Sequence, residues 1–341
     1  MNRKIKMLVI FSLPLLALVC VLVWRLVSFA MTIDEQWGAP AASRLEPAGS
    51  SRSDQTEARE REESEEHIIA PIESDQMENA LAYYEVDFSI YSQQALLINL
   101  TTGEVMFAHD ADVRVYPASL TKIMTVLVGL EQATSDTMIV KADFERILLD
   151  NASVAGFEYG ETRTLMEVLH GAMLPSGADA TATIAYNIAD SYEGFVALMN
   201  EKARELGMDD TNFTNASGLH HDNHYTTAAD MAILLRHALD NPRFREIFTA
   251  RAYSFTTFYG EQRTMYSTLF ANTWTTEFSG GEMIGGRTGF TNAAGRCLAS
   301  LATNGVDDFI LITFGADSYA ADQTAHIADA FAIYDYFLSR E

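Results

Sequence analysis

The sequence has 341 residues, of which 48% are hydrophobic, enough for one large domain or two modest ones with buried cores. It carries 23 lysine and arginine residues against 47 aspartate and glutamate residues, a formal net charge of −24. So acidic a chain repels nucleic acid, and we therefore expect no DNA or RNA partner.

The N-terminus, residues 1–31, has the pattern of a membrane segment. Three basic residues precede an apolar run over residues 7–24, which is long enough to cross a hydrocarbon core of about 30 Å. The basic flank predicts a cytoplasmic N-terminus and an extracytoplasmic domain. We favour a retained single-pass anchor over a cleaved secretion signal, for which residues 28–30 would supply the cleavage site. Because Cys20 lies in this run, Cys297 has no partner for a disulfide within the domain.

Residues 32–80 predict an acidic, disordered linker. The stretch from 50 to 66 is charged and polar and holds no aromatic residue, so it cannot bury enough apolar surface to become ordered. We expect this linker to hold a domain formed by residues 81–341 away from the membrane.

Two hairpins are predicted near the two ends of that domain. Apolar runs over residues 95–100 and 105–108 flank the first turn. Runs over 298–302 and 309–314 flank the second, in which Asn304 precedes a glycine, a strong signal for a hairpin turn.

Helical periodicity marks the region between and after the hairpins. One helix is predicted to open at Pro117, a second covers residues 195–206, and a third covers residues 323–338. Strands at both ends with helices between them indicate a mixed α/β domain. They predict one antiparallel sheet that the two ends of the domain complete together.

Ser119 and Lys122 form the centre of the predicted site. Pro117 at a first helical position places Ser119 in the opening turn, where free N–H groups and the helix dipole favour a developing negative charge. Lys122 lies on the same helix face, with its Cβ about 5–6 Å away. A lysine can activate a serine hydroxyl when burial and nearby positive charge lower its pKa. The same spacing also arises by chance, so the pair alone does not establish catalysis.

Two later motifs accompany this pair. Ser176 stands in the segment Leu-Pro-Ser-Gly-Ala-Asp, and Arg287 opens the triplet Arg-Thr-Gly after two glycines. Their order and spacing match the signature set of serine β-lactamases and penicillin-binding proteins.

With these motifs, the chain resembles the D-alanyl-D-alanine carboxypeptidases, the low-molecular-weight penicillin-binding proteins of the S11 peptidase type. The resemblance covers roughly residues 93–338 and rests on four ordered blocks: LLINLTTGEVMFAHDADVRVYPASLTKIMT, MNEKARELGMDDTNFTNASGL, YTTAADMAILLRHAL and GGRTGFTNAAGRCLAS. It implies an α+β catalytic domain, with a five-stranded antiparallel sheet, a helical lobe, and a cleft between them.

The resemblance also implies a catalytic role for each matched residue. Ser119 matches the acylated nucleophile and Lys122 the base that activates it. Ser176 matches a second serine that relays a proton towards the leaving group. No metal or organic cofactor is implied.

Substrate binding is implied for the third motif. Arg287, Thr288 and Gly289 match the strand that holds the substrate's terminal carboxylate. The backbone N–H groups of Ser119 and Phe290 match the oxyanion hole, which stabilises a tetrahedral intermediate.

The implied activity is that of a serine-type D-Ala-D-Ala carboxypeptidase, a hydrolase that removes the terminal D-alanine from peptidoglycan stem peptides. β-Lactams would be its covalent inhibitors. Two positions depart from the family pattern: Ala178 replaces the asparagine of the second motif, and Arg287 replaces the lysine of the third. Arginine keeps the charge and grips a carboxylate bidentately, but it does not easily lose a proton.

Three alternatives follow from the same sequence. A catalytically impaired, peptidoglycan- or penicillin-binding protein of the same fold would explain Ala178 and Arg287. A β-lactamase would need a dedicated base for its deacylating water, and no residue matches one. His220, His221 and His224 would suit a zinc site, although no HExxH-like helix accompanies them.

Overall fold

The computed structural model describes residues 89–142, 152–316 and 323–339. These ranges belong to one compact unit, Ile68–Glu341. The predicted anchor and linker, residues 1–31 and 32–80, lie outside the described residues. Within the ranges that are described, every helix is too short or too polar to cross a membrane.

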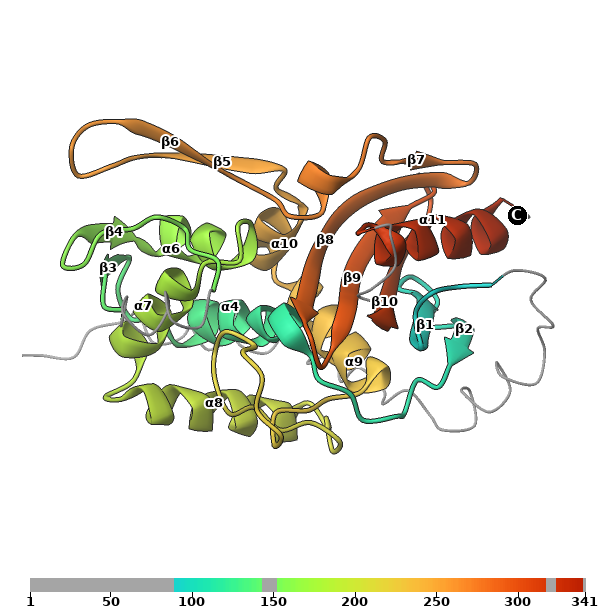
Figure 1. Ribbon diagram of the computed structural model, residues 1–341, viewed down its shortest axis with the longest axis horizontal. Coiled ribbons are helices and arrows are strands. Elements are labelled where there is room, and N and C mark those ends of the chain that lie inside the picture. Colours follow the sequence, from blue (N-terminus) through green and yellow to red (C-terminus); the bar gives the residue numbers. More distant parts are fainter. Residues whose placement is uncertain (1–88, 143–151, 317–322, 340–341) are drawn as a thin grey trace, which may run out of the picture. The chain divides into compact units, whose positions relative to one another are not determined.

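A six-stranded antiparallel sheet forms one part of this unit (Figure 1). Its strands follow the spatial order β2-β1-β10-β9-β8-β7. Their bounds are β1 Gln94–Asn99, β2 Val105–His109, β7 Glu277–Phe278, β8 Gly281–Thr291, β9 Gly295–Thr303 and β10 Asp308–Ala316. The mixed α/β fold was predicted with five strands, and the additional one is β7. A strand of two residues is too short to produce an alternating pattern in the sequence.

The two ends of the domain complete the sheet together, as the sequence predicted. β1 pairs antiparallel with β10, so that Gln94 lies opposite Phe314. Both predicted hairpins are present, β1 with β2 and β9 with β10. In the turn of the second hairpin, Gly305 has a φ of +86°, a conformation that glycine adopts at little cost.

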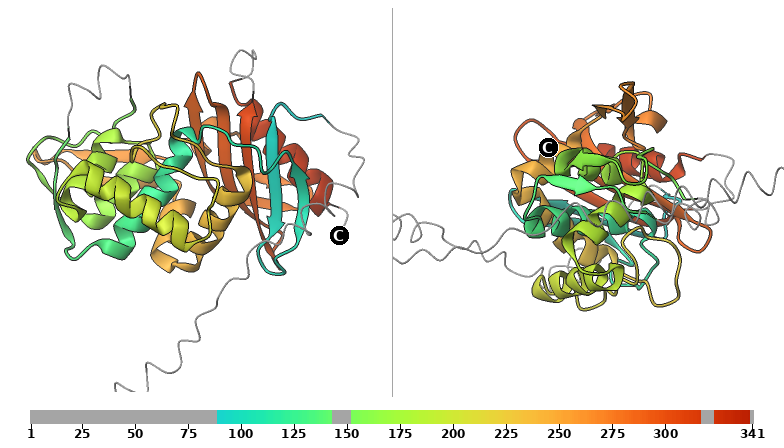
Figure 2. Two further views of the ribbon diagram at one scale, coloured as in Figure 1. Left: turned by 90° about the horizontal axis from the view of Figure 1, so that it is seen from below. Right: turned by 90° about the vertical axis from the view of Figure 1, so that its left-hand side faces the viewer.

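The sheet is covered on both faces. Because side chains alternate along a strand, Leu96, Ile98 and Ile310 pack towards the helical lobe, while Leu97 and Leu311 pack towards α11. Figure 2 shows the helical lobe beside the sheet and α11 at its other face. The lobe and the sheet therefore share the larger core, and α11 closes a second one.

Seven α-helices are described. They are α4 Thr121–Gln132, α6 Leu165–Met173, α7 Ala178–Ile188, α8 Tyr192–Glu205, α9 Ala228–Asp240, α10 Pro242–Thr249 and α11 Ala325–Leu338, with the 3-10 turns η1 Ala118–Leu120 and η2 Phe270–Asn272. The three helices predicted from periodicity correspond to α4, α8 and α11. Side-chain caps define several starts, such as the capping box between Thr164 and Glu167 at α6.

Helix α4 lies at the centre of the lobe. Nine consecutive residues, Thr121 to Gly129, are buried, so every face of the helix packs against other elements. Gly129 permits this packing, because a Cβ there would lie 2.9 Å from Leu169 of α6 and 3.2 Å from Ile184 of α7. The helix that carries the predicted nucleophile and base is thus a fixed element of the core.

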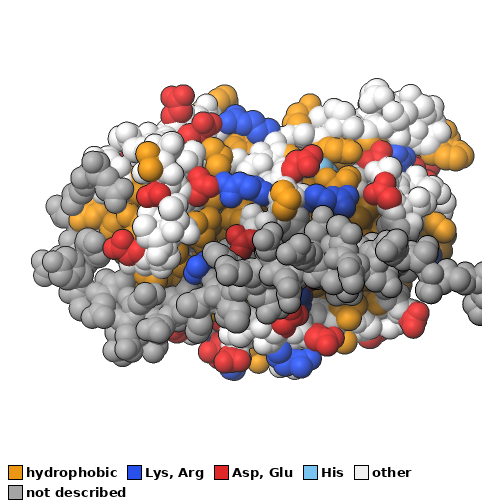
Figure 3. Space-filling view, turned by 180° about the vertical axis from the view of Figure 1, so that it is seen from behind, with side chains coloured by type: hydrophobic (Ala, Val, Ile, Leu, Met, Phe, Trp, Pro, Cys, Tyr) orange, Lys and Arg blue, Asp and Glu red, His pale blue; other side chains and the backbone are white. Residues whose placement is uncertain are grey.

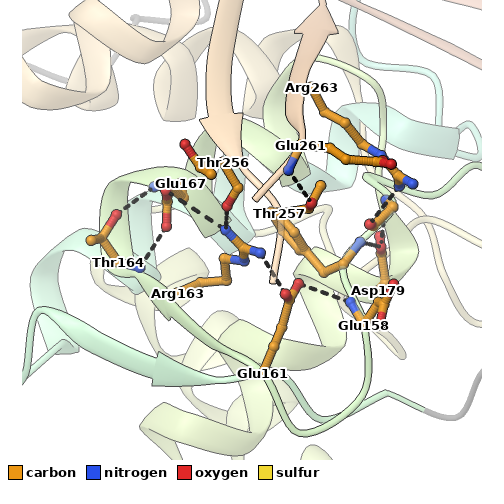
Figure 4. Close-up of polar contacts among 12 residues, drawn as sticks. Glu158, Glu161, Arg163, Thr164, Glu167, Asp179, Thr256, Thr257, Glu261 and Arg263 are labelled. Carbon is orange, nitrogen blue, oxygen red and sulfur yellow. Dashed lines mark hydrogen bonds and ion pairs between the residues drawn. The ribbon is translucent and has the colours of Figure 1, made fainter. Parts of the chain in front are cut away.

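A two-stranded hairpin, β5 Ala252–Thr256 and β6 Gln262–Tyr266, docks on the lobe (Figure 4). Arg163 lies in β4 Thr162–Thr164, which pairs with β3 Thr137–Ile139. Its guanidinium donates to the Thr256 carbonyl oxygen at 2.5 Å and forms an ion pair with Glu161. The hairpin is therefore joined to the lobe by a buried, charge-assisted contact.

Charged side chains of both signs are interspersed on the face that Figure 3 presents. Ion pairs such as Arg114 with Asp210 at 2.7 Å lie at exposed positions, where solvent screens the attraction and the pair adds little stability. The fold therefore depends on its two hydrophobic cores more than on surface charge.

Candidate active site

Ser119 lies in the short turn that precedes α4. It is the middle residue of η1, with Pro117 at the N-cap. Ala118 has a φ of +46° although it carries a side chain, a conformation that costs about 1–3 kcal/mol. Gly218 packs against the turn so closely that a Cβ there would lie 1.8 Å from the Ala118 carbonyl oxygen. Neighbouring elements therefore hold the turn in the form that presents Ser119.

Hydrogen bonds from His224 support the same turn. The Thr214 N–H donates to Nδ1 of His224 at 2.9 Å, so Nε2 carries the proton and donates to the Thr121 hydroxyl at 2.8 Å. That hydroxyl donates to the Ala118 carbonyl oxygen at 2.8 Å. Burial lowers the pKa of His224 to about 3. The imidazole is therefore neutral at physiological pH and positions the turn.

Lys122 lies one helical turn after Ser119 and is 2% exposed. Its Nζ is 3.3 Å from the Ser119 Oγ and also contacts the Ser217 carbonyl oxygen. Burial lowers the pKa of Lys122 well below its ordinary value, and the charge of Arg287 lowers it further, while Asp179 acts in the opposite direction. A lysine so placed can lose its own proton and accept that of Ser119.

Ser176 lies in the loop between α6 and α7. Its φ is +70°, and its Oγ lies 3.0 Å from the Ser119 Oγ. Asp179, three residues later, accepts hydrogen bonds from the backbone N–H groups of residues 155–157 at 2.7 to 3.1 Å (Figure 4). Burial raises the pKa of Asp179, and those N–H groups act against the rise. This carboxylate ties the loop of Ser176 to the neighbouring segment.

Ala178 occupies the position where the resemblance leads us to expect asparagine. It is 5% exposed and packs against Ala142 and Ala182. Its methyl group cannot hydrogen-bond to Lys122, whose Nζ contacts the Ser217 carbonyl oxygen instead. A backbone acceptor therefore serves the lysine in this chain.

Arg287 lies in β8 and is fully buried. Its Nη1 donates to the Met173 carbonyl oxygen at 2.7 Å, and its Nε donates to the Ser119 carbonyl oxygen at 3.3 Å. Nη2 has no hydrogen-bond partner among the described residues. Burial lowers the pKa of Arg287 to about 9. The guanidinium therefore joins β8 to the nucleophile's turn and places a positive charge beside Lys122.

The next three residues of β8 face the cleft in different ways. Thr288 donates its hydroxyl to the Thr268 hydroxyl at 2.7 Å. At Gly289 a Cβ would lie 3.0 Å from the Ser119 nitrogen, so the strand runs close to the nucleophile. Phe290 is 46% exposed. The oxyanion hole expected from the N–H groups of Ser119 and Phe290 stays a prediction.

A cleft of about 720 Å³ joins these residues. All seven residues predicted for the site line it, and they come from η1, α4, the loop after α6, and β8. Those residues are Ser119, Lys122, Ser176, Arg287, Thr288, Gly289 and Phe290. The structure thus places them together, and their individual roles remain predictions.

The histidines of the loop at residues 220–224 contact protein groups and do not converge on one point. His224 is bonded to Thr121 and Thr214, and the His220 ring packs edge-on against Tyr116 at 4.6 Å between centroids. Among the described residues, no group of three or more His, Cys, Asp or Glu side chains is placed to hold a metal ion.

The sequence did not predict three residues that belong to the site. Ser217 supplies the carbonyl oxygen that contacts Lys122, and Thr268 bonds to both Thr288 and Arg287. Arg296 lines the cleft at the start of β9. Ser217 and Arg296 stand in blocks that carry the resemblance, whereas no local pattern marks Thr268.

Comparisons of the sequence with known proteins found matches over most of the described domain. A model of the D-alanyl-D-alanine carboxypeptidase family matches residues 80–318. The chain is 35% identical over 231 residues to the D-alanyl-D-alanine carboxypeptidase DacF of Bacillus subtilis, which covers 67% of this chain and 58% of that protein. It is 31% identical over 255 residues to a D-alanyl-D-alanine carboxypeptidase of Streptomyces, covering 70% of this chain and 84% of the relative.

Solved structures resemble the fold as well. A Streptomyces DD-transpeptidase matches with a TM-score of 0.65 and 28% identity, over 74% of this chain and 98% of that one. A D-alanyl-D-alanine carboxypeptidase from Mycobacterium tuberculosis matches with a TM-score of 0.63 and 25% identity, over 74% of this chain and 93% of that one.

The charge of Arg287 should be visible in the pH dependence of acylation. Lys122 reacts as a base only when it is deprotonated, so the rate should rise with pH through its pKa. Arg287→Gln removes a positive charge that lowers this pKa, so the acidic limb of the profile should move to higher pH. Arg287→Lys should keep the limb near the wild-type position. Stopped-flow acylation by a chromogenic β-lactam measures the pH profile of each variant. An acidic limb that did not move in Arg287→Gln would show that the Arg287 charge does not act on the pKa of Lys122.

The asparagine missing at position 178 can be restored by Ala178→Asn. Lys122 already has the Ser217 carbonyl oxygen as a partner, and Ala178 belongs to a small apolar cluster. We therefore expect the second-order acylation rate to stay within about threefold of the wild type or to fall. Ala178→Leu matches the size of asparagine without its amide. A rise of tenfold or more in the asparagine variant alone, roughly 1.4 kcal/mol of barrier, would mean that the wild-type site is impaired.

Proposed function

The chain belongs to the D-alanyl-D-alanine carboxypeptidase family, and from that premise we propose that it is a serine-type D-Ala-D-Ala carboxypeptidase. Its substrate is a peptidoglycan stem peptide, from which it removes the terminal D-alanine. The chain spans 58% of the length of DacF, so the activity is inferred from the site of this chain and not from the name of that relative.

One observation carries the proposal. The Ser119 Oγ lies 3.0 Å from the Ser176 Oγ and 3.3 Å from the Nζ of a lysine whose pKa is lowered by burial. A hydroxyl between a second hydroxyl and a desolvated amine has a base to activate it and a route for its proton.

The first half of the reaction forms an acyl-enzyme. Neutral Lys122 accepts the Ser119 proton while the Ser119 Oγ attacks the carbonyl carbon of the penultimate D-alanine. Backbone N–H groups where η1 meets β8 would stabilise the oxyanion of the tetrahedral intermediate. The C–N bond then breaks, and the leaving amine of the terminal D-alanine receives the proton through Ser176.

The second half releases the shortened peptide. Water attacks the ester carbonyl carbon, and the Lys122–Ser176 pair accepts its proton and returns one to the Ser119 Oγ. The ester bond breaks, and the enzyme regains its starting state. A β-lactam would follow the first half and remain as a covalent adduct on Ser119.

Intact-mass analysis tests this assignment directly. Incubated with penicillin, the protein should gain the mass of one β-lactam, and Ser119→Ala should gain none. The wild type should release D-alanine from a peptide ending in D-Ala-D-Ala at the same rate with and without EDTA. Ser135→Ala, which changes an exposed serine outside the cleft, is the matched control. Labelling that persists in Ser119→Ala would overturn the nucleophile, acylation without D-alanine release would indicate a binding protein, and loss of activity in EDTA would indicate a metal site.

We further propose that residues 1–31 anchor the protein in the cell membrane and that residues 32–80 tether its extracytoplasmic domain. The apolar run and its basic flank support this topology. The full chain should stay in the membrane fraction after a high-salt wash, with its domain open to external protease, and a deletion of residues 1–31 should abolish membrane association. A soluble mature form beginning near residue 31 would show instead that the segment is a cleaved signal.

A further inference from the structure

The cleft contains three lysine or arginine side chains from the described residues, and they differ in exposure. Lys122 and Arg287 are 2% and 0% exposed, and both donate to acceptors within the protein. Arg296, at the start of β9, is only partly buried. We propose that Arg296 binds the terminal carboxylate of the substrate and thereby makes the site specific for a free C-terminus, an inference that rests on the proposed function.

Arg287 is poorly placed for that task. Four acceptors from the protein already take its donors: the carbonyl oxygens of Ser119, Met173 and Leu174 and the hydroxyl of Thr268. Only Nη2 lacks a partner among the described residues, and it belongs to a side chain with no exposed surface. A bidentate grip requires two N–H groups that point the same way into the cleft, and Arg287 does not offer them.

Arg296 has the opposite arrangement. Its side chain forms no hydrogen bond or ion pair within the part of the chain that the structure describes, and its buried Nε is without a partner there. The sequence holds 47 acidic residues against 23 basic ones, so carboxylates that could pair with an arginine are plentiful. An arginine that lines a cleft and remains unpaired in such a chain is available to an acidic ligand.

The sheet places this side chain beside two others that line the cleft. In the register of β8 and β9, Arg296 lies opposite Phe290, so the two side chains share one face of the sheet. The guanidinium carbon is 5.1 Å from the centre of the Phe290 ring, close enough for a cation–π contact that orients the guanidinium. Thr288, two residues before Phe290, lies on the same face, within diagonal reach of Arg296.

A second donor lies near this position. Thr268 accepts hydrogen bonds from Thr288 at 2.7 Å and from Arg287 at 3.4 Å, while its own hydroxyl proton has no acceptor among the described residues. A carboxylate between Arg296 and Thr268 would accept two N–H bonds and one O–H bond. It would therefore lie in the cleft that Ser119 also lines.

The proposal predicts how substrates are discriminated. A stem peptide with a free terminal carboxylate gains the charge-assisted bonds to Arg296, whereas a peptide whose C-terminus is amidated leaves the guanidinium unpaired. Hydrogen bonds to a charged group are stronger than neutral ones, so we expect a preference for the free acid of roughly 10- to 100-fold in kcat/KM.

The test measures kcat/KM for two N-acylated peptides that end in D-Ala-D-Ala, one a free acid and the other its C-terminal amide. Arg296→Gln should lower the value for the acid by roughly 10- to 100-fold, mainly through KM, and leave the value for the amide unchanged. Arg296→Lys should recover part of the loss. Arg243→Gln removes the same charge from an exposed position of α10 outside the cleft. It should leave kcat/KM unchanged for both peptides.

Two outcomes would overturn the proposal. If Arg296→Gln lowered kcat/KM equally for the acid and the amide, the residue would have a structural role. If it lowered kcat/KM for neither peptide, the carboxylate would bind elsewhere. If the wild type hydrolysed neither peptide, the proposed function would fail and the site would still be testable. The ratio of acylation rates for a β-lactam acid and its methyl ester should then fall in Arg296→Gln. A ratio equal to that of the wild type would reject Arg296 as the carboxylate site.

Discussion

Helix α4 lies at the centre of the helical lobe with each of its faces packed, so Lys122 is almost completely buried. Desolvation is the largest cause of the lowered pKa of this lysine, and it follows from the position of the helix and not from any single neighbour. The same burial fixes Ser119 one turn earlier. The chemistry of the site therefore depends on the packing of the lobe around one helix.

Two residues of the site adopt a backbone conformation that is unusual for a residue with a side chain. Ala118 and Ser176 have φ values of +46° and +70°, and each costs about 1–3 kcal/mol. Close packing by Gly218, the bonds from His224 to the Ala118 turn, and the Asp179 carboxylate behind Ser176 hold them in place. Both residues lie in the serine-bearing segments, which hold the Oγ atoms of Ser119 and Ser176 3.0 Å apart.

The two arginines of the cleft place their positive charges at different positions. Arg287 stands where the resemblance leads us to expect a lysine, and its longer, forked side chain reaches three backbone carbonyl oxygens across the interface between β8 and the lobe. It therefore acts on Lys122 and on the joint between sheet and lobe. Arg296 lies nearer the open cleft over Phe290, where its charge is available to a ligand. Because Arg296 supplies a cation to the open cleft, a buried arginine can occupy position 287 without leaving the cleft short of positive charge.

Local patterns in the sequence determined what depends on near neighbours. Asn304-Gly305 predicted a hairpin turn, Pro117 predicted the start of the nucleophile's helix, and the spacing of Ser119 and Lys122 placed them on one face. Recognition of the later motifs brought Ser176 and β8 to the same site, although 57 residues separate the two serines. Only the tertiary structure decided that Arg287 is buried, that Thr268 and Ser217 complete the cleft, and that the Arg296 side chain has no hydrogen-bond partner among the described residues. Burial and pairing depend on side chains from elements far apart in the chain, and neither periodicity nor spacing encodes them.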